Sequence, residues 1–254
     1  MFIAIDIGNS SINIGFFNES GLLVKRIDTK PLMSPSEYAE LLDRSIKEKN
    51  MDKSTIGSII SSVVPSYTGI WREALKGFTS VEPLLVSYKM KTGLTFTIPN
   101  PEQLGSDRIA NAVAAHELYK CPVASVDFGT ATTISITGKG GTYIGGAIMP
   151  GIQLMNESLV KETSTLPEIS LIPPETALGI DTTRCIQSGL FYGTAGAIEK
   201  ILNETEKAVG LKLKVVVTGG YGGIVHKFLK RRHALRPHLT LEGLKILYVR
   251  NTDA

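Results

Sequence analysis

The sequence predicts an α/β protein of two domains that share one order of secondary-structure elements. A short apolar run, an Asp, one residue, a Gly and a hydroxyl-rich turn occur at Asp6 and again at Asp127, 121 residues later. In each half, strands and then alternating helices and strands follow this pattern. A chain of 254 residues can bury two cores. We therefore expect domains of residues 1–115 and 116–254.

The first hairpin predicts either a phosphate-binding loop or a plain tight turn. An apolar strand over residues 2–5 runs into Asp6, and residues 12–16 alternate like the returning strand. The turn at residues 8–11 offers backbone N–H groups, an amide and hydroxyls for phosphate oxygens, and Asp6 can hold Mg²⁺ or its waters. Alternatively, Asp6 accepts turn N–H groups. The recurrence at Asp127 favours two phosphate loops, because a purely structural hairpin need not be duplicated.

The rest of the first half predicts alternating strands and helices. Ser34, Pro35 and Glu37 have the spacing of a capping box with Pro in the first turn. The expected elements are a strand at 21–27, helix 37–49, strand 58–64, helix 68–78, strand 84–86 and a loop at 93–103.

Residues 105–108 open an Ala-rich helix, expected over 109–119, and have two interpretations. In the structural one, Ser106 or Asp107 caps the helix and Arg108 faces solvent. In the functional one, N–H groups at the helix start hold a carboxylate, Arg108 pairs with it, and Asp107 is a base.

The second half predicts the same order of elements as the first. The expected elements are strands 123–126, 134–136 and 142–148, helix 152–160, a loop at 163–181, helix 182–209, strand 213–217, helix 223–232 and strand 244–249. The Gly-rich middle of helix 182–209 indicates close packing of elements. Gly219 and Gly220 either let a flat ligand such as adenine approach the backbone or form a plain turn.

Composition excludes several classes of function. The formal net charge of +3 gives no support to a nucleic-acid surface. The basic run at 227–238 is either a phosphate or nucleic-acid contact or the solvated end of a helix. No signal peptide, membrane span or zinc site is expected. Cys121 and Cys185 indicate reduced core thiols of a cytoplasmic protein.

Eight short motifs occur in a fixed order and carry a family resemblance. They are Asp6-Ile-Gly-Asn-Ser, Ser62-Val-Val-Pro65, Lys91-Thr-Gly-Leu94, Gly105-Ser-Asp-Arg108, Asp127-Phe-Gly-Thr-Ala-Thr132, Met149-Pro-Gly151, Ile186-Gln-Ser-Gly189 and Gly219-Gly220. Together they resemble the type III pantothenate kinases, a branch of the superfamily of acetate and sugar kinases, actin and actin-like heat-shock chaperones. The resemblance spans nearly the whole chain.

The resemblance implies a fold, a reaction and its cofactors. It implies two ribonuclease-H-like domains, each a mixed β-sheet with flanking helices. The implied reaction is ATP-dependent phosphorylation of pantothenate to 4′-phosphopantothenate, the first step of coenzyme A biosynthesis. It implies Mg²⁺ and a monovalent cation, K⁺ or NH₄⁺, and a homodimer with the substrate pocket at the interface. No nucleic-acid or membrane partner is expected.

The resemblance also implies roles for individual residues, with Asp107 as the catalytic base. Asp127 would bind the monovalent cation, and Asp6 would hold Mg²⁺ directly or through water. The implied ATP contacts are Asp6, Gly8, Asn9, Ser10, Ser11, Asn13, Thr130, Gly219 and Gly220. The implied pantothenate contacts are Gly105, Ser106, Asp107, Arg108 and Thr182.

Two departures and two rival functions accompany this resemblance. Ser10 stands where the family usually has Thr, which keeps the hydroxyl, and Ile98 stands where many members have a substrate-facing Tyr. One rival is a non-catalytic member with a regulatory role, against which Asp107 and both loops argue. The other is a different small-molecule kinase or ATPase of the superfamily. ATP turnover measured with and without pantothenate separates the three.

Overall fold

The protein, seen in a computed structural model that describes residues 1–48 and 57–252, divides into two compact units. Unit 1 comprises Met1–Gly93, Pro99–Ala114 and Leu239–Ala254, and unit 2 comprises Leu94–Ile98 and Ala115–His238. The C-terminal segment, which the sequence suggested for the second domain, is thus grouped with the first.

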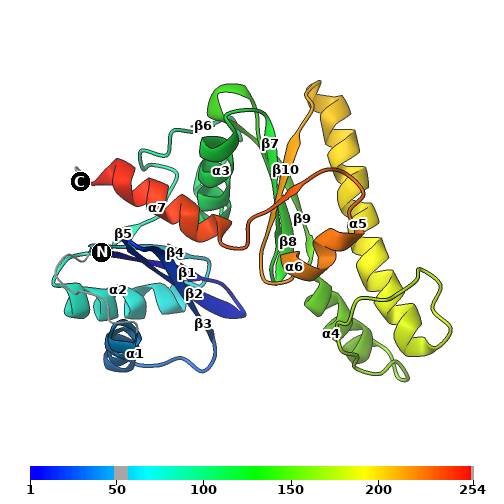
Figure 1. The fold of residues 1–254 in the computed structure, drawn as a ribbon, viewed down its shortest axis with the longest axis horizontal. Coiled ribbons are helices and arrows are strands. Elements are labelled where there is room, and N and C mark those ends of the chain that lie inside the picture. Colours follow the sequence, from blue (N-terminus) through cyan, green and yellow to red (C-terminus); the bar gives the residue numbers. More distant parts are fainter. Residues whose placement is uncertain (49–56, 253–254) are drawn as a thin grey trace. The chain divides into compact units, whose positions relative to one another are not determined.

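Unit 1 is a mixed five-stranded sheet with helices on both faces (Figure 1). Its elements are β1 (Phe2–Ile7), β2 (Ser11–Asn18), β3 (Gly21–Asp28), α1 (Pro35–Glu48), β4 (Gly57–Ser62), α2 (Pro65–Thr79), β5 (Leu84–Leu85), the 3₁₀ turn η1 (Pro101–Gln103), most of α3 (Ser106–Tyr119) and α7 (Leu239–Asn251). The strand order is β3-β2-β1-β4-β5, with β1 antiparallel to β2 and parallel to β4. Helices α1 and α2 cover one face, and α7 lies on the other (Figure 1).

The core of unit 1 explains which way Asp6 points. Ile3, Ile5 and Ile7 of β1 are fully buried in the cluster that includes Trp71 of α2. Because successive side chains of a strand point to opposite faces, Asp6 lies on the other face, the one on which α7 packs.

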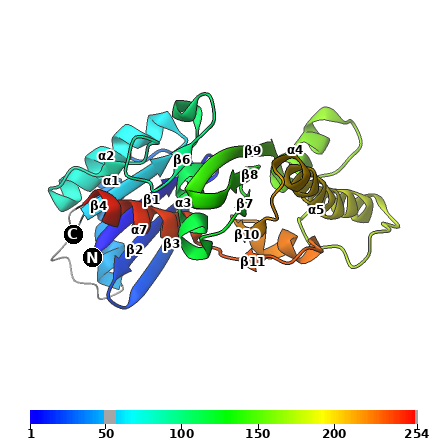
Figure 2. The same cartoon turned by 90° about the horizontal axis from the view of Figure 1, so that it is seen from above.

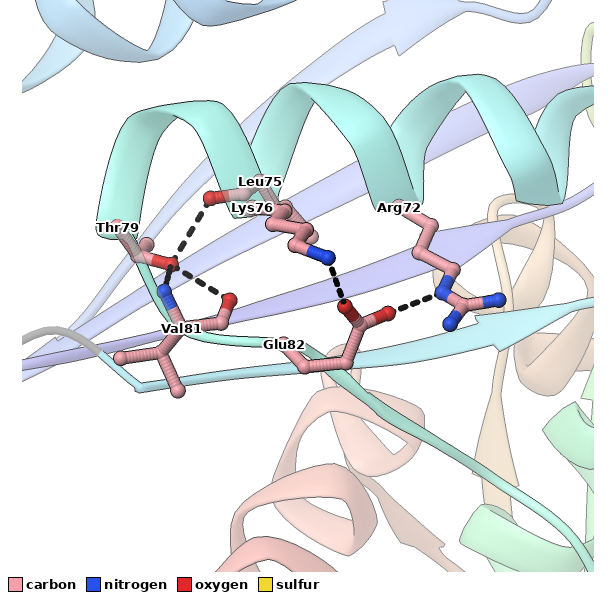
Figure 3. A network of polar contacts seen from close by, with 6 residues as sticks. All are labelled: Arg72, Leu75, Lys76, Thr79, Val81 and Glu82. Atoms are coloured by element: carbon pink, nitrogen blue, oxygen red, sulfur yellow. Dashed lines mark hydrogen bonds and ion pairs between the residues drawn. The ribbon is translucent and has the colours of Figure 1, made fainter.

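The ends of α1 and α2 are fixed by side chains. The predicted capping box of α1 is confirmed, because the Ser34 N–H donates to Glu37 Oε2 at 2.7 Å and the Glu37 N–H to Ser34 Oγ at 3.3 Å. The Glu37 carboxylate also accepts the Ser34 hydroxyl at 2.7 Å, and the bonds from the Ser34 N–H and then from this hydroxyl lower the pKa of Glu37. The end of α2 is held by Glu82, which pairs with Arg72 and Lys76 (Figure 3).

Unit 2 is a mixed six-stranded sheet (Figure 2). Its elements are β6 (Thr95–Phe96), β7 (Val123–Phe128), β8 (Ala131–Thr137), the 3₁₀ turn η2 (Lys139–Gly141), β9 (Thr142–Pro150), α4 (Ile152–Glu162), α5 (Thr182–Val209), β10 (Lys214–Thr218), α6 (Gly222–Val225), the 3₁₀ turn η3 (His226–Phe228) and β11 (Ala234–Leu235). The strand order β9-β8-β7-β10-β11 matches β3-β2-β1-β4-β5 of unit 1, and β6 adds an edge strand. The internal duplication and the α/β fold class are confirmed.

Two predicted elements near the C-terminus are wrong. Residues 244–249 form part of α7 instead of a strand, since an apolar run alone does not separate a buried strand from a buried helix. The strand that completes the repeat is the short β11. The helix expected over 223–232 ends near Phe228, because the N–H groups of Lys230 and Arg231 donate to Glu199 Oε1. Lys49, the predicted end of the first helix, lies outside the described residues.

The glycines of α5 do not pack closely within the chain, contrary to expectation. Among the described residues, a Cβ added at Gly189, Gly193 or Gly196 would meet nothing within 4 Å. All three are exposed, as is Tyr192 between them, so α5 presents an open face of small residues.

Candidate functional site

The first group of predicted site residues lies at the β1–β2 turn of unit 1. Asp6 stands in a lateral row of side chains, opposite Asn13 of β2 on one side and Ser61 of β4 on the other. The Ser61 hydroxyl donates to Asp6 Oδ1 at 3.1 Å. The register of the sheet therefore gives the carboxylate two polar neighbours.

The turn itself is closed by backbone hydrogen bonds. The Gly8 N–H donates to the Ser11 carbonyl at 3.0 Å. Thr29, at the end of β3, holds the turn by donating its hydroxyl to the Gly8 carbonyl at 2.7 Å and its N–H to the Ser10 carbonyl at 3.1 Å. Asn9 and Ser10 are exposed. The turn thus presents an amide and a hydroxyl on a tethered backbone.

Asp107 lies in the first turn of α3, in the same unit as Asp6. Its Oδ1 accepts the Arg108 N–H at 2.8 Å. A Cβ at Gly105 would lie 2.5 Å from that oxygen, so the preceding glycine makes room for the carboxylate. Burial raises the pKa of Asp107, and the N–H and positive charge of Arg108 oppose this rise in part. A raised pKa makes a carboxylate a better proton acceptor near neutral pH.

The Ser106 side chain turns toward β4 instead of capping its own helix. Its oxygen accepts the Ser62 N–H at 2.8 Å and lies 3.0 Å from both Ser61 Oγ and the Ser62 carbonyl oxygen. Only its backbone is then available for the predicted substrate contact. Ser61 and Thr29 were missed from the sequence. The signal for Ser61 was a pair of hydroxyls ending a buried strand that adjoins the strand of Asp6.

The second group surrounds Asp127 in unit 2. Asp127 occupies the same kind of row as Asp6, between Thr133 of β8 and Thr218 of β10. Gly219, with φ +91°, follows β10 directly, and a Cβ there would lie 2.3 Å from Asp127 Oδ1 and 2.5 Å from the Phe128 nitrogen. Glycine at 219 is therefore required by both the backbone angle and the nearness of the aspartate.

The second turn is tighter than the first and meets the start of a helix. Phe128 and Thr132, the last pair before the second turn, are one residue closer in the chain than Ile7 and Ile12, the last pair before the first turn. The Gly151 N–H donates to the Thr130 carbonyl at 2.9 Å, and Gly151 precedes the first residue of α4. A Cβ at Gly151 would clash with the Gly129 carbonyl at 2.3 Å, which explains the glycine of the Met149-Pro-Gly151 motif.

The remaining predicted residues are exposed at element ends of unit 2. Thr182 is the first residue of α5. Asp181, which the sequence analysis did not identify, caps that helix by accepting the Arg184 N–H at 2.8 Å. Gly220 lies next to Gly219 in the turn after β10. The structure thus gathers Asp6, Ser106 and Asp107 in one unit and Asp127, Thr130 and Gly219 in the other.

Within residues 1–48 and 57–252, no three His, Cys, Asp or Glu side chains gather as ligands of one metal ion. In the same part of the chain, no helix is long and apolar enough to cross a membrane. An open pocket of about 510 Å³ lies at the C-terminal end of α5. Charged side chains line it, and none of the predicted site residues does.

Comparisons with known proteins agree with this arrangement. The family model described as type III pantothenate kinase matches residues 2–204. A type III pantothenate kinase of Dehalococcoides mccartyi is 37% identical over 251 residues, covering 98% of this chain and 97% of its own.

Two solved structures share the fold. One, assigned to the Baf family of transcriptional activators in Campylobacter jejuni, aligns with a TM-score of 0.61 and 19% identity over 99% of this chain and 100% of its own. A ROK hexokinase of Thermus thermophilus aligns with a TM-score of 0.53 and 15% identity, covering 100% of this chain and 99% of its own. These likenesses show a shared α/β fold of two mixed sheets flanked by helices. Because the family model covers most of the sequence and the curated relative aligns almost end to end, the chain belongs to the type III pantothenate kinase family, whose enzymes phosphorylate pantothenate in coenzyme A biosynthesis.

Proposed function

We propose that the protein transfers the γ-phosphoryl group of ATP to the 4′ hydroxyl of pantothenate, with Asp107 as the proton acceptor. The observation that carries this is the half-buried carboxylate of Asp107, which has room beside Gly105 and lies in the unit that also holds Asp6. An alkyl hydroxyl is far too weak an acid to lose its proton before transfer. Asp107 therefore orients the hydroxyl and accepts the proton late, as the bond to phosphorus forms.

The β1–β2 turn fits a phosphate-binding role on its chemistry. Exposed Asn9 and Ser10 on a tethered turn can donate to phosphate oxygens, and Asp6 can hold Mg²⁺ directly or through water. One carboxylate is sufficient for this, since Mg²⁺ usually takes one or two carboxylates with water and phosphate oxygens. Bound there, Mg²⁺ would neutralise charge on the phosphates.

The turn after β7 is proposed to hold the monovalent cation and part of ATP. Asp127 supplies a carboxylate, and Thr130 lies where the start of α4 adds the positive end of a helix dipole. Gly219 and Gly220 leave the backbone open to the flat part of the nucleotide. K⁺ or NH₄⁺ at Asp127 would add positive charge near the transferring group.

Pantothenate is proposed to bind at the start of α3 and to Thr182. Its carboxylate would pair with Arg108 and with N–H groups of the first helical turn, including that of Ser106. A homodimer with the substrate pocket at its interface is proposed as well, supported by the open small-residue face of α5. A cytoplasmic location is proposed too and agrees with two free thiols. Neither is the core thiol that the sequence predicts, because Cys121 is half-buried and Cys185 is exposed.

The first test is ATP turnover with and without pantothenate. We expect phosphorylation that needs pantothenate, stops on chelation of Mg²⁺, and falls strongly when Na⁺ replaces K⁺ or NH₄⁺. ATP hydrolysis indifferent to pantothenate would contradict the proposed acceptor. Full activity in sodium buffer would contradict the cation role of Asp127.

A further inference from the structure

Two buried hydroxyls connect Asp6 to the start of α3. The Ser61 oxygen lies 3.1 Å from Asp6 Oδ1 and 3.0 Å from the oxygen of Ser106. The Ser106 oxygen in turn accepts the Ser62 N–H at 2.8 Å. Ser61 is fully buried and Ser106 is 8% exposed, so bulk water does not replace either contact.

Proton counting gives this connection a direction. Each serine has one proton to donate and lone pairs to accept. The Ser61 hydroxyl donates to the Asp6 carboxylate, which leaves the Ser61 oxygen free to accept the Ser106 hydroxyl. The Ser106 oxygen in turn accepts the Ser62 N–H. The Ser62 carbonyl oxygen, at 3.0 Å, is the alternative acceptor for Ser106. Donors aligned toward a negative charge strengthen one another, and the last bond is charge-assisted.

The corresponding row of unit 2 is built differently. Thr218 stands beside Asp127 in the register that Ser61 has beside Asp6. Its hydroxyl lies 3.5 Å from the Pro237 carbonyl oxygen. In unit 1, by contrast, the hydroxyl in this register contacts both Asp6 and the start of α3.

We propose that Ser61 is a positioning residue, which holds the Asp6 carboxylate in the orientation that binds Mg²⁺·ATP and, through Ser106, ties it to the turn of α3 that bears Asp107. The proposal rests on the proposed role of Asp6 as the Mg²⁺ ligand. It assigns the Ser106 hydroxyl to this internal connection and not to the substrate.

The chain supplies a matched pair of variants, Ser61→Ala and Ser58→Ala. Both remove a buried hydroxyl from β4. The Ser58 hydroxyl, however, has no hydrogen-bond partner among the described residues, and Ser58 pairs with Ile3 of β1 and not with Asp6. A third variant, Ser61→Cys, has a side chain of similar size with a weaker hydrogen-bond donor, and it replaces Ser61→Ala in the test if that variant does not fold. Thermal unfolding checks that each variant is folded.

The decisive readout is calorimetric binding of a non-hydrolysable ATP analogue, with Mg²⁺ and with EDTA. Losing one hydrogen bond to a charged group should weaken Mg²⁺-dependent binding by about tenfold in Ser61→Ala. Binding in EDTA should not change, Ser61→Cys should be intermediate, and Ser58→Ala should match the wild type. Unchanged binding in Ser61→Ala, or an equal loss in Ser58→Ala, overturns the proposal.

Kinetics and a double variant test the connection to α3. Ser61→Ala should raise KM for Mg²⁺·ATP while KM for pantothenate stays near the wild-type value. If the two serines act as one unit, Ser61→Ala with Ser106→Ala should bind the analogue no more weakly than the worse single variant. Additive losses refute the coupling. A wild type with this Mg²⁺ dependence that fails to phosphorylate pantothenate contradicts the proposed function and leaves the positioning role standing.

Discussion

At the scale of single residues, the Asp107 carboxylate is shielded from solvent and accepts a hydrogen bond from the Arg108 N–H. Burial raises the pKa of its carboxyl, so the ionised form is less favourable in the folded protein than in the unfolded chain. Such a group lowers stability at neutral pH, which is the expected behaviour of a residue kept for chemistry.

Asp107→Asn should reduce kcat by about 10²–10⁴-fold, because an amide cannot accept the proton. The same change should leave Tm equal or higher at pH 7, since it removes a charge that burial disfavours. Well below the unfolded pKa of about 3.9 the Asp is protonated in both states, and the pH-dependent part of the stability difference should vanish. Steady-state kinetics and thermal unfolding across pH measure both effects. A folded variant with near-normal turnover would remove Asp107 as the base.

Gly219 makes a second residue-scale prediction through its contact with Asp127. Gly219→Ala should lower Tm and impair activation by K⁺ or NH₄⁺, because its Cβ would displace the aspartate and strain a backbone angle of φ +91°. Gly223→Ala is the control, since a Cβ there meets nothing within 4 Å. Cation titrations of both variants report the difference, and equal behaviour would argue against the contact.

At the scale of elements, Glu206 ties the end of α5 to the segment that leads into β10. Its carboxylate accepts the Leu213 N–H at 2.9 Å and lies 3.2 Å from both Lys212 and Arg231. Burial by itself would raise the pKa of Glu206, but these three donors outweigh it and the pKa is lowered. Glu206 thus holds together three segments that follow one another in the chain.

Glu206→Gln should lower the free energy of unfolding by about 1–3 kcal/mol at pH 7, because charge-assisted bonds are lost at a buried position. Since the folded pKa is lowered, this stability is present above the unfolded value near 4.3 and is lost as pH falls through the folded pKa. The two proteins should therefore converge in acid. Urea unfolding at several pH values measures this.

The control is Glu204→Gln, two residues earlier in α5. Lys200 and Lys207 lower the pKa of Glu204 to about 2. That carboxylate is nevertheless exposed and screened by solvent, so we expect little change in stability. If Glu204→Gln cost as much as Glu206→Gln, burial would not be what distinguishes the two sites.

At the scale of the whole molecule, the open face of α5 provides a test of the proposed homodimer. Gly193→Leu should leave the fold intact, because Gly193 is exposed and a Cβ there would meet nothing within 4 Å among the described residues. The variant should sediment as a monomer instead of a dimer, and its kinase activity should fall because the substrate pocket is proposed to lie at the dimer interface. Gly77→Leu, at an equally open glycine of α2, should remain dimeric. A Gly193→Leu protein that stays dimeric would take this face out of the proposed interface.

Local chemistry in the sequence was sufficient to predict the internal duplication, both Asp-x-Gly turns, the capping box at Ser34 and the helix of residues 182–209. These depend on periodicity, turn residues and capping side chains, which lie close together in the chain. The same holds for the family, because its motifs are short and ordered.

Tertiary structure decided what depends on distant partners. The apolar run of α7 fits a strand as well as a helix, and packing against the sheet selects the helix. Glu199 accepts the N–H of Lys230, 31 residues away in the chain, and so ends the helical segment after β10. Ser61 meets Asp6 only through the pairing of β1 with β4, 55 residues apart. Burial raises the pKa of Asp107, and that burial depends on the folded surroundings. A sequence states which groups are available, while strand register and burial determine which of them meet.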